Sequence, residues 1–288
     1  MKADLLTELK AQMPRFSKGQ KKIAAYLIEH FDKAAYLTAA KLGKSADVSE
    51  STVVRFASEI GFDGYPQLQQ ALRDVSRNML TAVQRMEVAS SNIDADDVLH
   101  KVLHSDIEKI RKTLEEIDKQ TFDKAVDAIT DARQIYVIGI GSAAALANFL
   151  TFYLNHIFDN VKILGSTSAS DVFENIVSID ENDVLVALSF PRYSTRTLKA
   201  MHYANEKKAK VIAITDSTMS PLSEFADHLL VARSDMASFV DSLVAPLSLI
   251  NALIVSIGLR RKDEVSNKLQ KLEQFWQEYK VYDDSTDR

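Results

Sequence analysis

Short apolar runs alternate with helix-length segments through the second half of the chain, and this alternation constrains the fold most. The runs are QIYVIGI, VKIL, VLVALSF, KVIAIT and HLLVAR, between residues 134 and 233. Apolar strands that alternate with helices are typical of a parallel sheet covered on both faces. We therefore expect an α/β domain with a five-stranded parallel sheet flanked by helices.

Helices are expected around these strands at 142–158, near 171–177, and at 194–208, 241–259 and 264–279. The apolar run at 243–259 is interrupted by Pro246 and by three polar residues, so it predicts a buried helix and no membrane contact. The first residues form no apolar stretch of signal-peptide length. The chain has no cysteine, which excludes disulfides and Cys-type zinc sites. We expect a cytoplasmic protein.

Charge divides the chain unevenly, although its 288 residues carry a net charge of only −5. Residues 1–77 hold twelve Lys and Arg against nine Asp and Glu, whereas the remainder holds 23 against 31. The first part is therefore the part suited to a polyanionic partner. We predict a first domain at 1–77, a linker helix region at 78–105 and a second domain at 106–288, with a break between about 87 and 96 at Ser90-Ser91-Asn92.

Residues 37–61 predict two short helices joined by a tight turn at 46–48. The apolar residues of the second helix recur at helical spacing and form one inward stripe: Val53, Phe56, Ala57 and Ile60. On the opposite face lie Ser51, Arg55 and Ser58. Small hydroxyls and one guanidinium near a helix N-terminus suit the DNA major groove. We interpret the pair as a helix-turn-helix motif in an all-α N-terminal domain.

The turn departs from the usual motif at two positions. Asp47 stands where Gly is commoner, and Gly43 stands where Ala is commoner. Asp tolerates a left-handed backbone, and Gly43 is small enough for two helices to cross closely. The residues expected to contact DNA are Lys44, Ser49, Glu50, Ser51, Thr52 and Arg55. Four cations near the start of an earlier helix can meet phosphates: Arg15, Lys18, Lys21 and Lys22.

Further helices are expected at 3–12, after the cap residue Ser17, and after Gly64, where Pro66 suits a first helical turn. The last of these carries apolar residues in steps of four and three: Leu68, Leu72, Val75, Met79, Ala82 and Met86. Such a seam either packs in the core of the monomer or pairs two chains. A further helix carries Val102, Ile107, Ile110, Leu114 and Ile117.

Two strand ends are rich in groups that bind anions. Ligands of an open parallel sheet lie beyond the carboxyl ends of the strands, where helix N-termini offer free amides. One end is Gly139-Ile140-Gly141-Ser142, and the other is the stretch from Ser189 to Arg196, with two guanidiniums. The predicted ligand-binding residues are Gly141, Ser142, Ser189, Arg192, Ser194 and Thr195. At a third end, Asp216 either binds sugar hydroxyls or caps a helix.

Cofactor and catalytic sites are not predicted. The dinucleotide fingerprint is incomplete because Ala144 replaces its third glycine and no acidic residue follows the next strand. The six histidines show no metal-ligand motif, and no serine lies in a nucleophile elbow. Asp241 and Glu174 are carboxylates available for proton transfer, but nothing in the sequence singles them out.

The stretch VSESTVVRFASEIGFDGYPQL resembles the helix-turn-helix domain of the RpiR/MurR family of bacterial transcription regulators. Residues from about 106 onward resemble the SIS (sugar isomerase) domain of that family. The resemblance implies a non-enzymatic, cytoplasmic regulator of carbohydrate metabolism genes, dimeric or tetrameric, whose SIS domain binds a phosphosugar effector that modulates binding to double-stranded operator DNA.

The sequence departs from the ligand loops of the family. In the Gly-x-Gly-x-Ser loop the hydroxyl would fall at Ala143, and in the Ser-x-Ser-Gly-x-Thr loop Pro191 and Arg192 replace Ser and Gly. Our hypothesis is that Arg192 supplies the charge that replaces the lost hydroxyl contacts. Two other functions stay open: a sugar-phosphate isomerase with an accessory helical domain, and a ligand-sensing module whose helical domain binds protein.

Overall fold

The computed structural model describes residues 5–76, 83–86, 97–165, 169–234 and 240–281. The chain forms two compact units, one of residues 1–101 with 236–241 and one of residues 102–235 with 242–288. The expected break at 87–96 and most of the predicted linker region at 78–105 lie outside the described residues. The three domain limits therefore stay predictions, and each unit is considered by itself.

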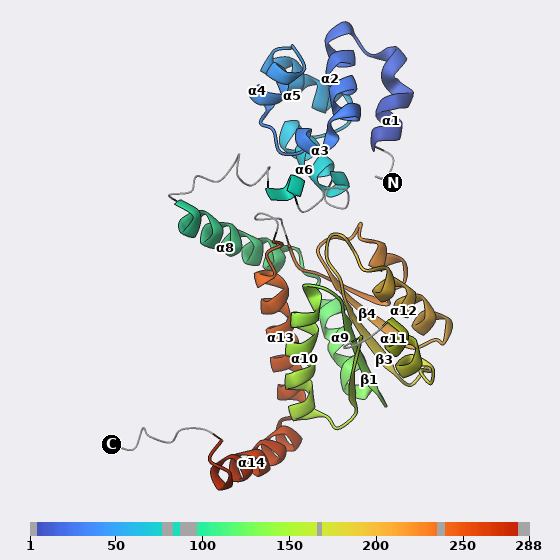
Figure 1. The fold of residues 1–288 in the computed structure, drawn as a ribbon, viewed down its shortest axis with the longest axis vertical. Helices are drawn as coiled ribbons and strands as arrows, with labels where there is room; N and C mark the ends of the chain where they lie inside the picture. The colour runs from blue at the N-terminus through green and yellow to red at the C-terminus, as the bar shows by residue number, and fades with distance from the viewer. Residues whose placement is uncertain (1–4, 77–82, 87–96, 166–168, 235–239, 282–288) are drawn as a thin grey trace. The chain divides into compact units, whose positions relative to one another are not determined.

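The described part of the first unit is helical, as expected for an all-α domain (Figure 1). Its elements are α1 (Leu5–Gln12), a 3₁₀ turn (Met13–Arg15), α2 (Lys18–Glu29), α3 (Phe31–Ala34), α4 (Ala39–Ser45), α5 (Glu50–Glu59) and α6 (Tyr65–Ser76). Ser17 caps α2 and exchanges hydrogen bonds with Gln20 in a capping box, which satisfies two free amides of the first turn. Leu27, Leu42 and Phe56 are fully buried in the core that these helices share.

Helix α6 contributes to that core. Pro66 stands in its first turn, as predicted, and Leu68 and Leu72 have no exposed surface. For these two leucines the core alternative is confirmed. Met79 and Ala82 of the predicted seam lie outside the described residues, as does the side chain of Val75, and Met86 is 52% exposed.

The second unit holds the predicted five-stranded parallel sheet. Its strands are β1 (Ile135–Gly139), β2 (Val161–Leu164), β3 (Val184–Leu188), β4 (Lys210–Thr215) and β5 (His228–Val231), in the order β2-β1-β3-β4-β5. All four neighbouring pairs are parallel. The carboxyl ends of β1 and β3 lie side by side because Gly139 pairs with Leu188.

Helices cover both faces of the sheet (Figure 1). Helices α9 (Lys119–Asp131), α10 (Ala143–Ile157) and α13 (Val244–Arg260) pack with one set of alternating strand residues, such as Val137 and Val186. Helices α11 (Ala169–Ile176) and α12 (Thr195–Glu206) pack with the other set, such as Ile138 and Ala187. The three-layer arrangement follows from the two-residue period of strand side chains.

The remaining helices are α8 (Val98–Glu116) and α14 (Lys262–Glu278). Helix α9, which only Ile117 and Asp118 separate from α8, was not predicted from the sequence. The side chain of Asp118 accepts a hydrogen bond from the amide of Thr121 at 2.8 Å, so an N-cap signal was present.

The long apolar segment near the end of the chain is a core helix, as predicted. Leu249, Ile250 and Leu253 of α13 are buried against the sheet. Among the described residues no single helix is long and apolar enough to cross a membrane. Helices α13 and α14 reach the required length and apolar composition only when they are taken together, and the pair is bent by 100° at the break between them.

Candidate functional sites

The turn between α4 and α5 depends on the two unusual residues of the motif. Asp47 has a φ of 54°, in the left-handed region that Asp tolerates. A Cβ on Gly43 would lie 2.9 Å from the carbonyl oxygen of Val48, so the chain crosses α4 at a distance that excludes a larger residue. Both departures from the common pattern are therefore compatible with the helix-turn-helix geometry.

Helix α5 is firmly seated by its apolar stripe. Val53, Phe56 and Ala57 are fully buried, and the ring of Phe56 meets the ring of Phe16 edge-on at 5.4 Å between centroids. Buried side chains of this size each contribute about 1.5–3 kcal/mol through the removal of apolar surface from water. The stripe thus fixes the rotation of α5 about its axis.

The opposite face of α5 is open within the first unit. Ser51, Arg55 and Ser58 are exposed, as are Lys44 and Glu50. The guanidinium of Arg55 donates from Nε to the carbonyl oxygen of Ser51 at 3.4 Å, a long contact on a solvent-exposed face. These side chains stay accessible to a macromolecular partner of this unit.

Two of the predicted DNA-contacting residues also have structural roles. Ser49 is the N-cap of α5, and its hydroxyl accepts from the amide of Thr52 at 3.3 Å. The same hydroxyl lies 2.9 Å from that of Ser51 and 2.8 Å from that of Thr52. Thr52 is half-buried, and its methyl group would lie 3.5 Å from a Cβ on Gly19 of α2.

Val54 shares the outward face of α5 and was not among the residues predicted from the sequence. This side chain is 41% exposed, one turn after Ser51 and one turn before Ser58. An apolar group at such a position can contact the methyl group of thymine in the major groove. Its helical spacing from the two serines was the signal that could have identified it.

One of the four predicted phosphate-binding cations is engaged by the turn. Lys22 of α2 forms an ion pair with Asp47, and the hydrogen bond and the charge of Lys22 lower the pKa of Asp47. Gln20 of the same helix donates to the carboxylate of Glu59 at the end of α5. Both contacts are solvent-exposed, so they orient α2 against the motif and add little stability.

In the second unit, two helix N-termini lie at the carboxyl edge of the sheet. Three residues separate β1 from α10, and six residues separate β3, the neighbouring strand, from α12. The connection from Ser189 to Arg196 carries two cations, Arg192 and Arg196, and no acidic residue. The helix N-termini carry a partial positive charge, and the two guanidiniums add full positive charges. This edge of the sheet therefore suits an anion.

The two glycines of the first loop have different roles. A Cβ on Gly139 would lie 2.5 Å from the carbonyl oxygen of Ala143, so this glycine permits α10 to pack closely on β1. Gly139, which the sequence places in the same anion-binding strand end, is therefore needed for helix packing. Gly141 has a φ of 66° and open space around its Cβ position, which suits a loop that must expose its backbone.

Ser142 is exposed in the same loop. It occupies the N-cap position of α10 with helical φ and ψ, and its hydroxyl makes no capping bond. The side chain thus keeps its hydrogen-bonding capacity for an external group.

The second loop is held together by its own hydroxyls. Ser189 is 3% exposed, and its hydroxyl accepts from the amide of Ser194 at 3.0 Å. Ser194 caps α12 and accepts from the amide of Thr197 at 3.3 Å. Thr195 and Arg192 are exposed. Arg192 has a φ of 65°, a left-handed conformation that costs a non-glycine residue about 1 kcal/mol.

Asp216 ties this loop to the end of β4. Its carboxylate accepts from the hydroxyl of Tyr193 at 2.8 Å and from that of Thr215 at 3.3 Å. The residue is 1% exposed. It therefore holds Tyr193 in place, and the two alternatives from the sequence stay predictions.

The two carboxylates considered for proton transfer belong to different units. Asp241 accepts from Arg85 at 2.8 Å in an ion pair of the first unit, where the arginine side chain is 4% exposed. Glu174 is exposed on α11, in the second unit.

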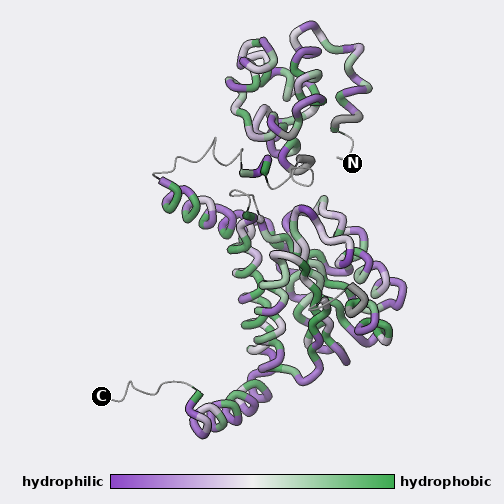
Figure 2. The backbone as a smooth tube through the Cα atoms, viewed as in Figure 1, coloured by the Kyte–Doolittle hydropathy of each residue, from purple (hydrophilic) through white to green (hydrophobic). Residues whose placement is uncertain are grey.

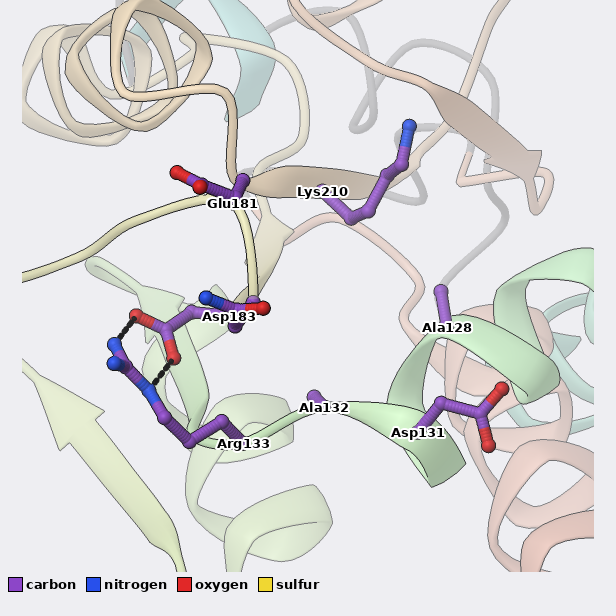
Figure 3. A pocket seen from close by; sticks show the side chains of 8 residues that line it. Ala128, Asp131, Ala132, Arg133, Glu181, Asp183 and Lys210 are labelled. Carbon is purple, nitrogen blue, oxygen red and sulfur yellow. Dashed lines mark hydrogen bonds and ion pairs between the residues drawn. The ribbon is translucent and has the colours of Figure 1, made fainter.

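A polar pocket of about 430 Å³ opens at the amino edge of the sheet, opposite the predicted ligand site (Figure 3). The guanidinium of Arg133 donates two hydrogen bonds, of 2.9 and 2.8 Å, to the buried carboxylate of Asp183. These bonds raise the pKa of the guanidinium. Arg133 also lies 2.9 Å from Asp180. These contacts connect the residues before β1 to the residues before β3, so their role is to stabilise the sheet.

The two units together define a class of protein: a regulator in which a helix-turn-helix unit accompanies an α/β sensor unit. Residues 3–78 match the helix-turn-helix domain of the rpiR family, and residues 128–256 match the SIS domain. The chain belongs to the RpiR family of helix-turn-helix transcriptional regulators with a SIS domain.

Known proteins of the same organisation are similar over most of the chain. The transcriptional regulator HexR of Escherichia coli is 27% identical over 280 residues, 94% of this chain and 93% of its own length. The sugar isomerase domain of an RpiR transcription factor from Sphaerobacter thermophilus is 28% identical, with a TM-score of 0.58 over 62% of this chain and 99% of that domain structure.

The Vibrio vulnificus NanR protein, solved in complex with ManNAc-6P, has the same fold over both units. It is 22% identical, with a TM-score of 0.59 over 94% of this chain and 97% of its own.

Proposed function

We propose that the chain is a cytoplasmic transcriptional regulator of carbohydrate metabolism genes that binds operator DNA through α5. The observation that carries this proposal is the exposed face of α5. Ser51, Arg55 and Ser58 are exposed on this helix, whose opposite face is buried in the core of the first unit. Such a helix can enter a major groove without any rearrangement of its own unit. Lys44, Glu50 and Val54 extend the same surface.

A titration of the full chain with DNA from upstream of its own gene tests this proposal. Arg55→Ala should weaken specific binding about 5- to 150-fold if the guanidinium reads a base, and should weaken binding to all sequences alike if it holds a phosphate. The matched control is Lys271→Ala, which removes one positive charge from α14 of the other unit. If the wild type, Arg55→Ala and Lys271→Ala bound this DNA with the same affinity, and salt did not change that affinity, the result would contradict the proposal and favour a protein-binding module.

The effector is, in this proposal, an anionic sugar derivative, most simply a sugar phosphate, bound at the carboxyl edge of the sheet. Support comes from the two adjacent helix N-termini, the exposed Ser142 and Thr195, and the cations Arg192 and Arg196. ManNAc-6P in the NanR complex belongs to the same chemical class. No cofactor or metal takes part in the proposal.

Two variants of Arg192 test the effector site. Arg192→Ala and Arg192→Gly both remove the charge, but Gly also accepts the left-handed backbone without strain. Calorimetric titration with hexose and pentose phosphates should therefore show equal losses of about 10-fold or more in both variants. Affinity retained in both would remove Arg192 from the site, and a loss confined to Arg192→Ala would indicate a conformational role.

The proposed mechanism is linkage between the two ligands. An effector that binds one arrangement of the assembled chains better than another shifts the population of that arrangement and so changes operator affinity. An isomerase is the competing function. Its candidate carboxylates are Asp241, which is paired with Arg85, and Glu174, which is exposed on α11. Turnover of a sugar phosphate by the purified protein would contradict the regulator proposal.

A further inference from the structure

The first unit is built from two separate stretches of the chain. Besides residues 1–101 it includes residues 236–241, which belong in sequence to the connection between β5 and α13 of the second unit. The chain therefore leaves the second unit after β5, contributes a short segment to the helical unit, and re-enters the second unit before α13. Asp241 is the last residue of this segment.

An ion pair holds Asp241 within the first unit. The guanidinium of Arg85 donates to its carboxylate at 2.8 Å, and the two side chains are only 4% and 13% exposed. The partners are 156 positions apart in the sequence. A hydrogen-bonded ion pair at this burial holds both residues in one geometry, because the loss of either partner would leave a nearly buried charge uncompensated.

Ser242, the next residue, is held by the second unit. Its hydroxyl donates to the carboxylate of Asp106 on α8 at 2.6 Å. Helix α13 begins two residues later and buries Ala245 and Leu249 against the sheet. Figure 2 shows that α13 is hydrophobic along most of its length. Neighbouring α-carbons are about 3.8 Å apart, so Asp241 and Ser242, each fixed by a different unit, cannot move independently.

Helix α8 holds the connection at both of its ends. The hydroxyl of Thr113 accepts from the amide of Arg233 at 2.9 Å, and Glu116 pairs with the guanidinium of Arg233 at 2.5 Å. Asp106 of the same helix accepts from Ser242 at the other end. The connection is therefore fixed twice in the second unit and, at Asp241, in the first.

The start of the connection contacts the proposed effector edge. The amide of Ala232, directly after β5, donates to the carbonyl oxygen of Thr215 at the end of β4 at 2.8 Å. Asp216, the residue after Thr215, accepts from the hydroxyl of Tyr193 in the effector loop. Hydrogen bonds and short stretches of backbone thus lead from the effector loop to the connection.

We propose that the Arg85–Asp241 ion pair couples the effector edge of the sheet to the helical unit. This inference rests on the proposed function, because it names the contact through which that regulation passes. A rearrangement of the effector loop reaches β4 through Asp216, the connection through Ala232 and the first unit through Asp241. Arg85 and Asp241 are positioning residues: they set how strongly one ligand changes the affinity for the other.

Hydrogen exchange of the full chain, without DNA or effector, tests this coupling. Arg85→Met removes the charge and keeps much of the side-chain volume. It should accelerate amide exchange at least about threefold in the first turns of α13 and in residues 189–196, as well as in α6, because loss of the pair releases the connection. Asp241→Asn is nearly isosteric, should have the same effect, and keeps the test available if Arg85→Met does not fold.

Two further variants separate coupling from a structural role. Arg73→Met removes another arginine contact of the first unit, the bond from Nε to the carbonyl oxygen of Ala35 at 3.1 Å, and should leave exchange in α13 unchanged. Arg85→Lys keeps the charge and should accelerate exchange in α13 less than Arg85→Met does. Acceleration confined to the first unit in both Arg85→Met and Asp241→Asn, or equal acceleration of α13 in Arg73→Met, would overturn the proposal.

A double-mutant cycle on DNA affinity tests the functional consequence. Tyr193→Phe removes the hydroxyl that Asp216 holds, and should change the affinity for DNA from upstream of the chain's own gene about fivefold or more, as for a typical coupling between sites. In a chain that also carries Asp241→Asn, the same substitution should change the affinity less than about twofold. Equal shifts in both backgrounds, or no shift in either, would overturn the coupling. A chain that binds no DNA in any form would contradict the regulator proposal alone, since the exchange experiment needs no DNA.

Discussion

Helices α5 and α8 are both amphipathic, but they face their surroundings in opposite ways. Helix α5 buries Phe56 and exposes Arg55, whereas α8 buries Thr113 and exposes Leu114. The core of the first unit holds α5 through apolar contacts, and hydrogen bonds to Arg233 and Ser242 hold α8.

This difference shows that an apolar stripe identifies a face but not its destination. Burial of the stripe against the unit's own core is the usual outcome, because it removes apolar surface from water. On α8 hydrogen bonds to Thr113 and Asp106 fix the inward face, and the apolar stripe stays exposed within its unit.

The largest effect is expected from Phe56→Ala in the apolar anchor of α5. The loss of a fully buried ring should lower the free energy of unfolding of the first unit by about 3–5 kcal/mol. Urea unfolding followed by circular dichroism measures it. Val54→Ala on the exposed face of the same helix is the control, with an expected change within about 0.5 kcal/mol. A similar small change for both would mean that α5 is not held by its stripe.

An intermediate effect is expected from Thr113→Val in the polar anchor of α8. Valine keeps the shape of the side chain but leaves the amide of Arg233 without its acceptor, which should cost about 1–3 kcal/mol. The measurement is the unfolding of the second unit in urea. Lys112→Ala, one residue away and exposed, should have almost no effect. Equal stabilities of both variants and the wild type would show that the hydrogen bond does not fix α8.

The smallest effect is expected at the turn before α5. Asp47→Ala should destabilise the first unit by about 1 kcal/mol more than Asp47→Asn, because Asn tolerates the left-handed backbone and Ala does not. Both variants lose the ion pair with Lys22, so their difference isolates the backbone conformation. Thermal unfolding of the two variants measures this difference, and identical midpoints would contradict the assignment.

Much of the architecture was predictable because it depends on local signals. The alternating apolar runs predicted the parallel sheet, Ser17 and Pro66 marked the starts of two helices, and Asp47 and Gly43 were correctly judged compatible with the turn. Helix α9 escaped because its start depends on a single cap residue, Asp118, only one residue after the neighbouring apolar pattern.

The residues of the candidate sites could be named from the sequence, but the separate structural role of each could not. The sequence identified the hydroxyls and cations of the sheet edge, but it did not distinguish Gly139, needed for helix packing, from Gly141, which stands open. It also did not reveal that Asp216 holds Tyr193, because residues 23 positions apart meet only in the folded sheet.

By itself the sequence determined the elements of this protein: which segments form strands, which residues cap helices, and which faces of each helix are apolar. These properties depend on backbone preferences and on side-chain periodicity within one segment. Only the tertiary structure decided which face of α8 turns inward. That face accepts hydrogen bonds from the amide of Arg233 and the hydroxyl of Ser242. Both donors lie more than a hundred residues away from α8 in the sequence.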